Sequence, residues 1–283
     1  MASFTNFATL SYNGGTTNSK IVTGEILEAL TAVKTAVSAN YSAGDRITYA
    51  LSLVNTGTAA ITDYTVTDNL GGYTVGANTV YPLAYNAGTV RYYINGVLQA
   101  APTVTAGPPL TVTGLTVPAG GSAVLIYETT ATPVAPLATG SSITNTATIT
   151  GAGLTTPITA QATVETANSA DLTISKALSP TTVTENGRIT YTFVISNTGN
   201  TEATATGNVV VTDTFAPILR NIAVTYNGTA WTEGTNYTYN AATGVFTTLA
   251  GQITVPAATF TQNTDGTFTV TPGTATLVIT GTV

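Results

Sequence analysis

Cysteine and histidine are both absent from this chain of 283 residues, and basic residues are scarce. Without Cys the chain forms no disulfide and offers no thiol nucleophile, and without His it lacks the commonest general base and a common metal ligand. Three Lys, four Arg and a net charge of −6 provide no basic surface for nucleic acid or anionic lipid. We therefore expect no cofactor, no metal ion and no nucleic-acid partner. Stability must come from packing, polymerisation or another covalent link.

Targeting and membrane segments are also missing. The first residues, MASFTNF, lack the basic and long apolar regions of a secretory signal, and no run of about 18 apolar residues could span a membrane. This predicts that a signal has been removed or that the protein is not exported by that route, and it excludes membrane insertion.

The residues that are abundant indicate β-structure. The chain is rich in Thr, Val and Gly, is 43% hydrophobic and has only 7% charged residues. β-Branched residues and Gly-rich turns at this density are typical of sheets, and the low charge argues against a disordered chain. We expect a folded, all-β protein.

An internal repeat divides the chain in two. Residues 30–57 match residues 172–199 at one constant offset, and residues 120–131 parallel 272–283. Short alternating segments separated by NG, NTG, PAG and PG turns predict two tandem immunoglobulin-like β-sandwich domains. The predicted domains are an N-terminal arm (1–24), a complete first repeat (25–168) and a second repeat (169–283). Apolar residues at helical spacing over 25–37 also allow a short helix there. Since the repeat favours a strand from residue 30 onward, we assign 25–29 as a connector.

The second repeat lacks a closing segment that the first repeat contains. The first continues through SITNTATITGAGLTT (142–156), and the N-terminal SFTNFATLSYNGGTT (3–17) resembles that segment. A sandwich without its last strand exposes an apolar groove and unpaired backbone groups. Insertion of the arm would fill the groove and bury Phe4, Ala8 and Leu10.

The arm could enter its own second domain or that of another copy. An arm at one end and a groove at the other make a heterologous contact, which generates an open fibre when it is repeated. Self-insertion has a high effective concentration but requires residues 18–29 to span the first domain. The geometry favours a head-to-tail homopolymer.

Each domain directs one Lys, one Asp and one Asn onto an apolar face. Strand alternation gives Lys34, Asp68 and Asn145 in the first domain. In the second it gives Lys176 and Asp213, with Asn6 arriving on the arm. Because burial of such groups is costly unless they satisfy one another, they should meet.

Two chemical outcomes are open for these groups. One is a buried Lys–Asp ion pair bridged by the Asn amide. The other is an autocatalytic isopeptide bond, in which neutral Lys attacks the Asn carbonyl while Asp68 or Asp213 shuttles protons and ammonia leaves. The scarcity of Lys favours the bond, within the first domain for Lys34 and between subunits for Lys176.

The run ADLTISKALSP, GRITYTFVISNTGN and VVVTDTF, with NTATIT closing the first unit, resembles the conserved repeat of bacterial surface proteins called domain of unknown function eleven. The resemblance implies a surface or fibrous protein. Related Gram-positive pilin and adhesin domains carry Lys/Asn/acid isopeptide bonds. Small two-repeat proteins of this type resemble subunits of clostridial spore appendages, which assemble in the mother cell without an export signal. Typical members instead sit in long secreted chains with a wall anchor.

Two other functions are less consistent with the sequence. An enzyme acting on an external substrate is disfavoured, because the chain has no catalytic motif and few carboxylates. A monomeric or self-complemented adhesin is the alternative, since the Tyr-rich stretches VRYYING (90–96) and TNYTYN (235–240) could stack on sugars, although Tyr in sheets more often makes cross-strand pairs. The tip, the anchor and any receptor stay unspecified.

Overall fold

The computed structural model describes residues 2–26, 29–151 and 154–283, and the predicted all-β class is confirmed. The only helix in these ranges is a single 3₁₀ turn, η1 (Ala205–Gly207). The chain divides into two compact units, Met1–Pro136 with Ser142–Glu165 and Leu137–Ser141 with Thr166–Val283. No helix in the described part of the chain is long and apolar enough to cross a membrane.

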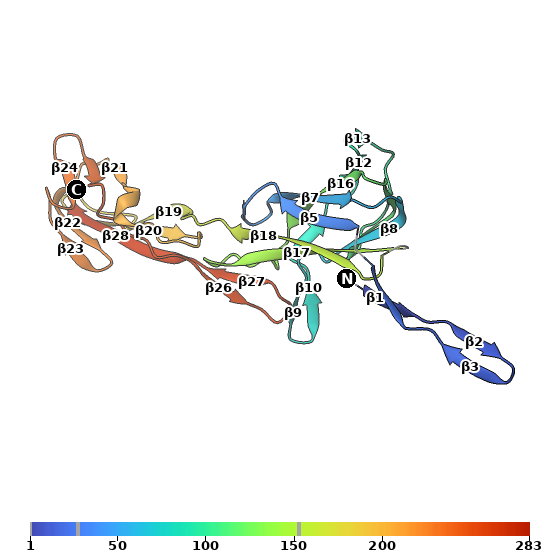
Figure 1. Ribbon diagram of the computed structural model, residues 1–283. Coiled ribbons are helices and arrows are strands. Elements are labelled where there is room, and N and C mark those ends of the chain that lie inside the picture. Colours follow the sequence, from blue (N-terminus) through green and yellow to red (C-terminus); the bar gives the residue numbers. More distant parts are fainter. Residues whose placement is uncertain (1, 27–28, 152–153) are drawn as a thin grey trace. The chain divides into compact units, whose positions relative to one another are not determined.

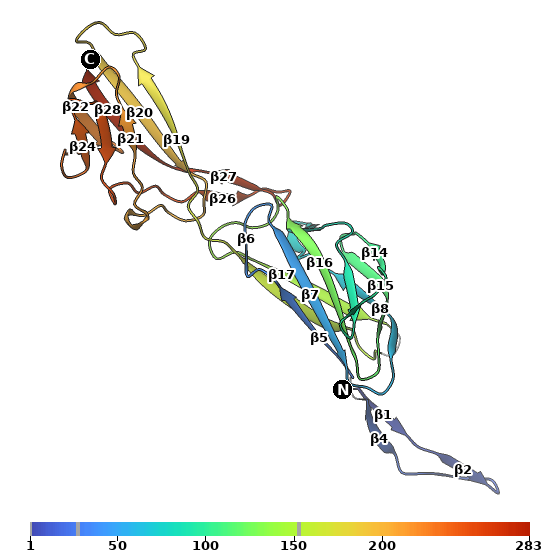
Figure 2. The ribbon, with the colours of Figure 1, turned by 90° about the horizontal axis from the view of Figure 1, so that it is seen from above.

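The N-terminal arm is a long β-hairpin, drawn in blue in Figures 1 and 2. Its outer strands β1 (Ala2–Asn6) and β4 (Val22–Ile26) pair with each other, and β2 (Thr9–Tyr12) pairs with β3 (Gly15–Asn18). The turn is Asn13-Gly14, both with positive φ (43° and 80°), as a two-residue hairpin turn requires. The competing helix over 25–37 does not form in the described residues, since β4 runs to Ile26 and β5 begins at Leu30. Residues 27–28 of the predicted connector lie outside the described ranges.

The first unit is a sandwich of two antiparallel sheets. One has the order β13 (Val97–Leu98), β12 (Arg91–Ile94), β16 (Ser122–Ala131), β7 (Arg46–Asn55), β5 (Leu30–Ala36), with β11 (Leu83–Tyr85) also pairing with β16. The other has the order β14 (Thr103–Thr105), β15 (Leu110–Val117), β8 (Ile61–Asp68), β17 (Ser142–Thr150), β18 (Ile158–Thr166), β6 (Asn40–Tyr41). A small hairpin joins β9 (Tyr73–Val75) to β10 (Asn78–Val80).

The core of the first unit follows from strand alternation. Every second residue of β7 is buried, including Tyr49 and Leu51, and the other sheet contributes Val66 from β8 and Ile149 from β17. The closing strand β17 therefore completes this core.

The second unit repeats the first sheet but has a smaller second one. Its large sheet has the order β19 (Leu172–Ser179), β20 (Arg188–Asn197), β28 (Gly273–Thr282), β22 (Arg220–Tyr226), β23 (Thr229–Trp231). The small sheet has the order β21 (Thr212–Thr214), β25 (Val245–Thr248), β24 (Tyr237–Asn240), and a separate hairpin joins β26 (Thr259–Gln262) to β27 (Phe268–Thr271). The sequence offset is kept in the pairing, because Lys34 lies opposite Leu51 and Lys176 opposite Phe193.

Candidate functional site

A buried ion pair lies in the core of the first unit. The Nζ of Lys34 on β5 is 2.5 Å from Oδ2 of Asp68, at the end of β8, and both side chains are shielded from solvent. The same Oδ2 accepts a hydrogen bond from the Tyr127 hydroxyl. Burial lowers the pKa of Lys34 from 10.5 to about 8, although Asp68 opposes the shift. The core thus contains an amine that loses its proton more readily than an ordinary lysine.

Asn145 on β17 is fully buried close to this pair. Its neighbour two residues on, Ala147, lies directly opposite Asp68 in the β17–β8 ladder. Among the described residues, neither its amide nitrogen nor its amide oxygen has a hydrogen-bond partner. Such a group costs roughly 1–3 kcal/mol in a core, so its presence needs an explanation.

Two tyrosines connect the ion pair to the asparagine. Lys34 Nζ lies 4.8 Å from the ring centre of Tyr49 and 5.8 Å from that of Tyr127. Burial raises the pKa of both hydroxyls, and the nearby Asn145 amide partly opposes the rise. Sequence reasoning missed these hydroxyls, although an inward-facing Tyr on an alternating strand is itself a signal that its hydroxyl needs a partner.

The second unit contains the same ion pair in an open setting. Lys176 Nζ is 2.5 Å from Asp213 Oδ2, but 41% of the Lys176 side chain and 17% of the Asp213 side chain are exposed. Lys176 also lies over the ring of Tyr191, at 4.6 Å. Tyr191 is the counterpart of Tyr49. Tyr49 lies opposite Tyr127 on the neighbouring strand, whereas Tyr191 lies opposite Ile279. The expectation that Lys176 points into a core is wrong: its side chain is half-exposed, because no strand in the described part of the chain covers this side of the unit.

The uncovered side is an unpaired sheet edge beside an apolar groove. In the first unit β8 pairs with β15 on one edge and with β17 on the other, whereas β21 pairs only with β25 among the described residues. A groove of about 150 Å³ lies next to β21, lined by Leu172, Thr173, Ile174, Ile195, Val209, Val210 and Val211. Ile174 and Val210 are 55% and 45% exposed. At the position that β17 occupies in the first unit, the described part of the second unit therefore has an unpaired strand edge next to an apolar groove.

The arm residues of the candidate site are exposed. Asn6 ends β1, Phe4 lies on the same strand, Leu10 lies on β2, and Ala8 lies between the two strands. Phe4 and Leu10 are 54% and 62% exposed, unlike their counterparts Ile143 and Ile149 in β17, which are buried. The arm thus presents Phe4 and Leu10 largely to solvent, although the ring of Phe4 also lies over Gly24 of the same hairpin.

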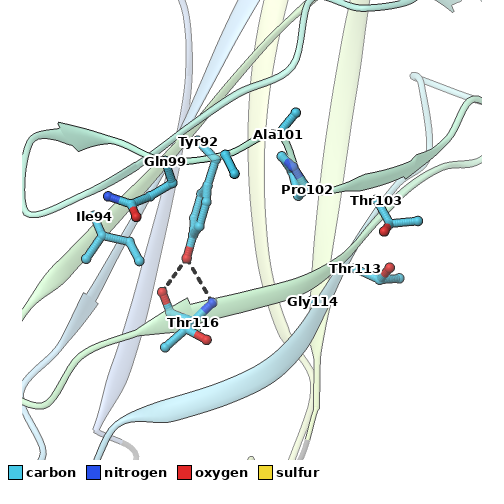
Figure 3. Close-up of a pocket in the computed structure, with 10 residues that line it drawn as sticks. Tyr92, Ile94, Gln99, Ala101, Pro102, Thr103, Thr113, Gly114 and Thr116 are labelled. Carbon is cyan, nitrogen blue, oxygen red and sulfur yellow. Dashed lines mark hydrogen bonds between the residues drawn. The ribbon is translucent and has the colours of Figure 1, made fainter.

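A separate hollow of about 410 Å³ lies in the first unit between β12 and β15 (Figure 3). Tyr92 points into it, and its hydroxyl bonds to the backbone of Thr116. None of the ten lining residues is charged.

Tyr92 and Tyr237, from the two Tyr-rich stretches, are buried, so these rings are not presented for stacking on a sugar. In the described part of the chain, no three His, Cys, Asp or Glu residues could together hold a metal ion.

No family model matches the chain, and no curated protein matches it. Among solved structures, the major pilin subunit of Bacillus cereus is 15% identical over 96% of this chain and 73% of its own, with a TM-score of 0.36. The pilus backbone protein of Streptococcus pneumoniae is 14% identical over 86% of this chain and 55% of its own (TM-score 0.36). The N-terminal domain of a Streptococcus gordonii adhesin is 15% identical over 47% of this chain and 31% of its own (TM-score 0.35). With TM-scores this low, these likenesses carry no conclusion about the function of this chain.

Proposed function

We propose that the chain is a structural subunit of an extracellular or spore-surface fibre. It polymerises head-to-tail when the N-terminal arm of one copy enters the open second unit of the next. The observation that carries the proposal is the contrast between the two ion pairs: the first has a buried asparagine beside it, and the second has an unpaired edge in its place. The resemblance to spore-appendage subunits supports the spore surface as the location.

The proposal includes an amide bond at each ion pair. Proton transfer from Lys34 to Asp68 gives a neutral amine, which attacks the side-chain carbonyl carbon of Asn145. The new N–C bond forms as the bond to the amide nitrogen breaks. Asp68 passes a proton to that nitrogen, which leaves as ammonia, and takes one from the attacking amine. Lys176, Asp213 and Asn6 would do the same between two subunits.

The first test is boiling in detergent followed by electrophoresis, combined with electron microscopy of the unboiled material. Wild-type protein should form fibres and a ladder of multimers that survives boiling. Asn6→Ala should remove the ladder, while Asn18→Ala, an asparagine on β3 of the same arm, should keep it. A single monomer band with no fibres would contradict the proposal and leave a self-complemented subunit as the alternative.

The second test is the intact mass of the chain. A bond between Lys34 and Asn145 lowers the mass by one ammonia, and Asn145→Ala should abolish that loss without affecting the ladder. An unreduced wild-type mass would exclude the bond in the first unit and leave the ion pair alone.

A further inference from the structure

We propose that the arm is donated as an intact hairpin and that its first half adds to β21 of a second copy, with Ala8 opposite Asp213 and Leu10 opposite Val211. This inference rests on the proposed function and specifies its interface.

The register comes from the complete unit. There β17 pairs with β8 so that Ala147 lies opposite Asp68 and Ile149 opposite Val66. The repeat makes Asp213 the counterpart of Asp68 and Val211 that of Val66, and the arm makes Ala8 and Leu10 the counterparts of Ala147 and Ile149. A slip of one residue would turn every apolar side chain outward, so the buried face excludes it. The match between residues 3–17 and 142–156 selects this register over a slip of two residues.

The groove of the second unit fits the side chain that this register assigns to it. Val211 is buried and forms part of the groove with Leu172, Ile174 and Ile195. In the first unit the residue opposite Val66 is Ile149, which is fully buried. Leu10, at 62% exposed, is of similar volume and would fill the groove.

The donor half of the hairpin keeps the required alternation. Ser19 N donates to Ala8 O at 2.8 Å and Ala8 N donates to Ser19 Oγ at 2.8 Å, so these residues are opposite each other. The next pair along the hairpin is Asn6 with Val22. Between these two pairs the donor half has one residue, Phe7, whereas the return half has two, Lys20 and Ile21. The extra residue is a bulge in the return strand. Phe4, Asn6, Ala8 and Leu10 stay in phase for one face.

The return half has a place in the completed sheet. In the first unit β17 is followed by β18, which covers its second edge and then meets β6. In the arm, β3 and β4 already cover the second edge of β2 and β1. Donation of a single strand would break these ladders, whereas the intact hairpin reproduces the order of β8, β17 and β18. The ring of Phe4 lies over Gly24, where any side chain would collide with it, so this hairpin is specifically packed.

The register is tested by disulfide trapping, which the absence of native cysteine makes unambiguous. In an Asn6→Ala background, which removes the proposed bond, Thr9→Cys with Thr212→Cys should give reducible multimers on mild oxidation, because Thr148 and Thr67 are directly opposite in the first unit. The matched control, Ser11→Cys with Thr212→Cys, represents a slip of two residues and should link several-fold less. Equal or better linkage of the slipped pair would overturn the register.

The hairpin is tested by locking it. Ser11 and Thr16 are opposite each other, so Ser11→Cys with Thr16→Cys closes the hairpin with a disulfide. The locked arm should assemble into fibres as well oxidised as reduced. Assembly only after reduction would show that a single strand is donated, which overturns this inference but leaves the proposed function standing. Wild-type protein that forms no fibres would contradict both proposals. Trp231 fluorescence checks that the second unit of each variant is folded.

Discussion

Each unit contains a lysine whose Nζ lies 2.5 Å from an aspartate Oδ2, yet the pair in the first unit is buried in the core and the pair in the second unit is partly exposed to solvent. The large sheet is similar in both, so the difference comes from the facing sheet, where β17 covers the first pair and no described strand covers the second. Whether such a pair is buried therefore depends on one strand, which under the proposed function a second copy supplies to the second unit.

The largest expected effect is the loss of each lysine. In an Asn145→Ala background, which cannot form the proposed bond, Lys34→Met leaves Asp68 buried without its cation and should destabilise the first unit by about 3–5 kcal/mol. Lys176→Met in unassembled protein should cost less than about 1 kcal/mol. Denaturant unfolding measures both, with Trp231, the only tryptophan, reporting the second unit and tyrosine circular dichroism both units. Equal costs would mean that the two settings do not differ energetically.

The Tyr127 hydroxyl has no counterpart in the second unit, since Ile279 stands in its place. Tyr127→Phe removes a hydrogen bond to Asp68 and should cost about 1.5–3 kcal/mol in the same unfolding measurement. Tyr49→Phe is the matched control, because that buried hydroxyl has no hydrogen-bond partner and its loss should be nearly neutral. A neutral Tyr127→Phe would show that Asp68 does not depend on this donor.

The pH dependence of stability separates a free Lys34 from a linked one. In Asn145→Ala, which cannot form the bond, the folded chain releases the Lys34 proton near pH 8 while the unfolded chain keeps it to about pH 10.5. The unfolded state then binds more protons, so stability should rise by about 1–2 kcal/mol between pH 8 and pH 9.5. That window lies below the ordinary tyrosine pKa of 10.0. Adding Lys34→Met should remove the rise, and a linked wild-type chain should show none.

The smallest effect is expected at the surface. Arg46 and Glu128 approach to 3.6 Å with 76% and 36% of their side chains exposed. Arg46→Ala should change the stability of the first unit by less than about 0.5 kcal/mol. This change should become smaller still at high salt, because salt screens the exposed ion pair. A larger loss would mean that an exposed ion pair also contributes strongly to stability, so that burial would not explain a large effect at Lys34.

Much of the fold could be predicted because the repeat gives two independent readings of one pattern. Strand alternation alone placed Lys34, Asp68 and Asn145 on the inward face, and the structure has all three buried. Alternation could not give the half-exposure of Lys176, because that depends on which distant strand covers it. It also could not give the direction of the Tyr127 hydroxyl, since a strand pattern fixes the face of a ring and not the partner at its tip.

The arm shows a different limit. The Asn13-Gly14 turn is visible in the sequence, but the bulge opposite Phe7 depends on backbone pairing that no alternation pattern shows. The hairpin β26–β27 was likewise not foreseen, because its residues have no counterpart in the matched parts of the repeat.

Lys34 and Asn145 lie on β5 and β17, with residues 35–144 between them. If an amide joins these two side chains, a pulling force applied to the ends of the unit passes from one strand to the other through that bond. The intervening strands then carry no tension, however far the fibre is stretched. With such a bond, Lys34 and Asn145 would carry the pulling force past the rest of the unit, and the extensibility of the unit would not depend on most of its hydrogen bonds.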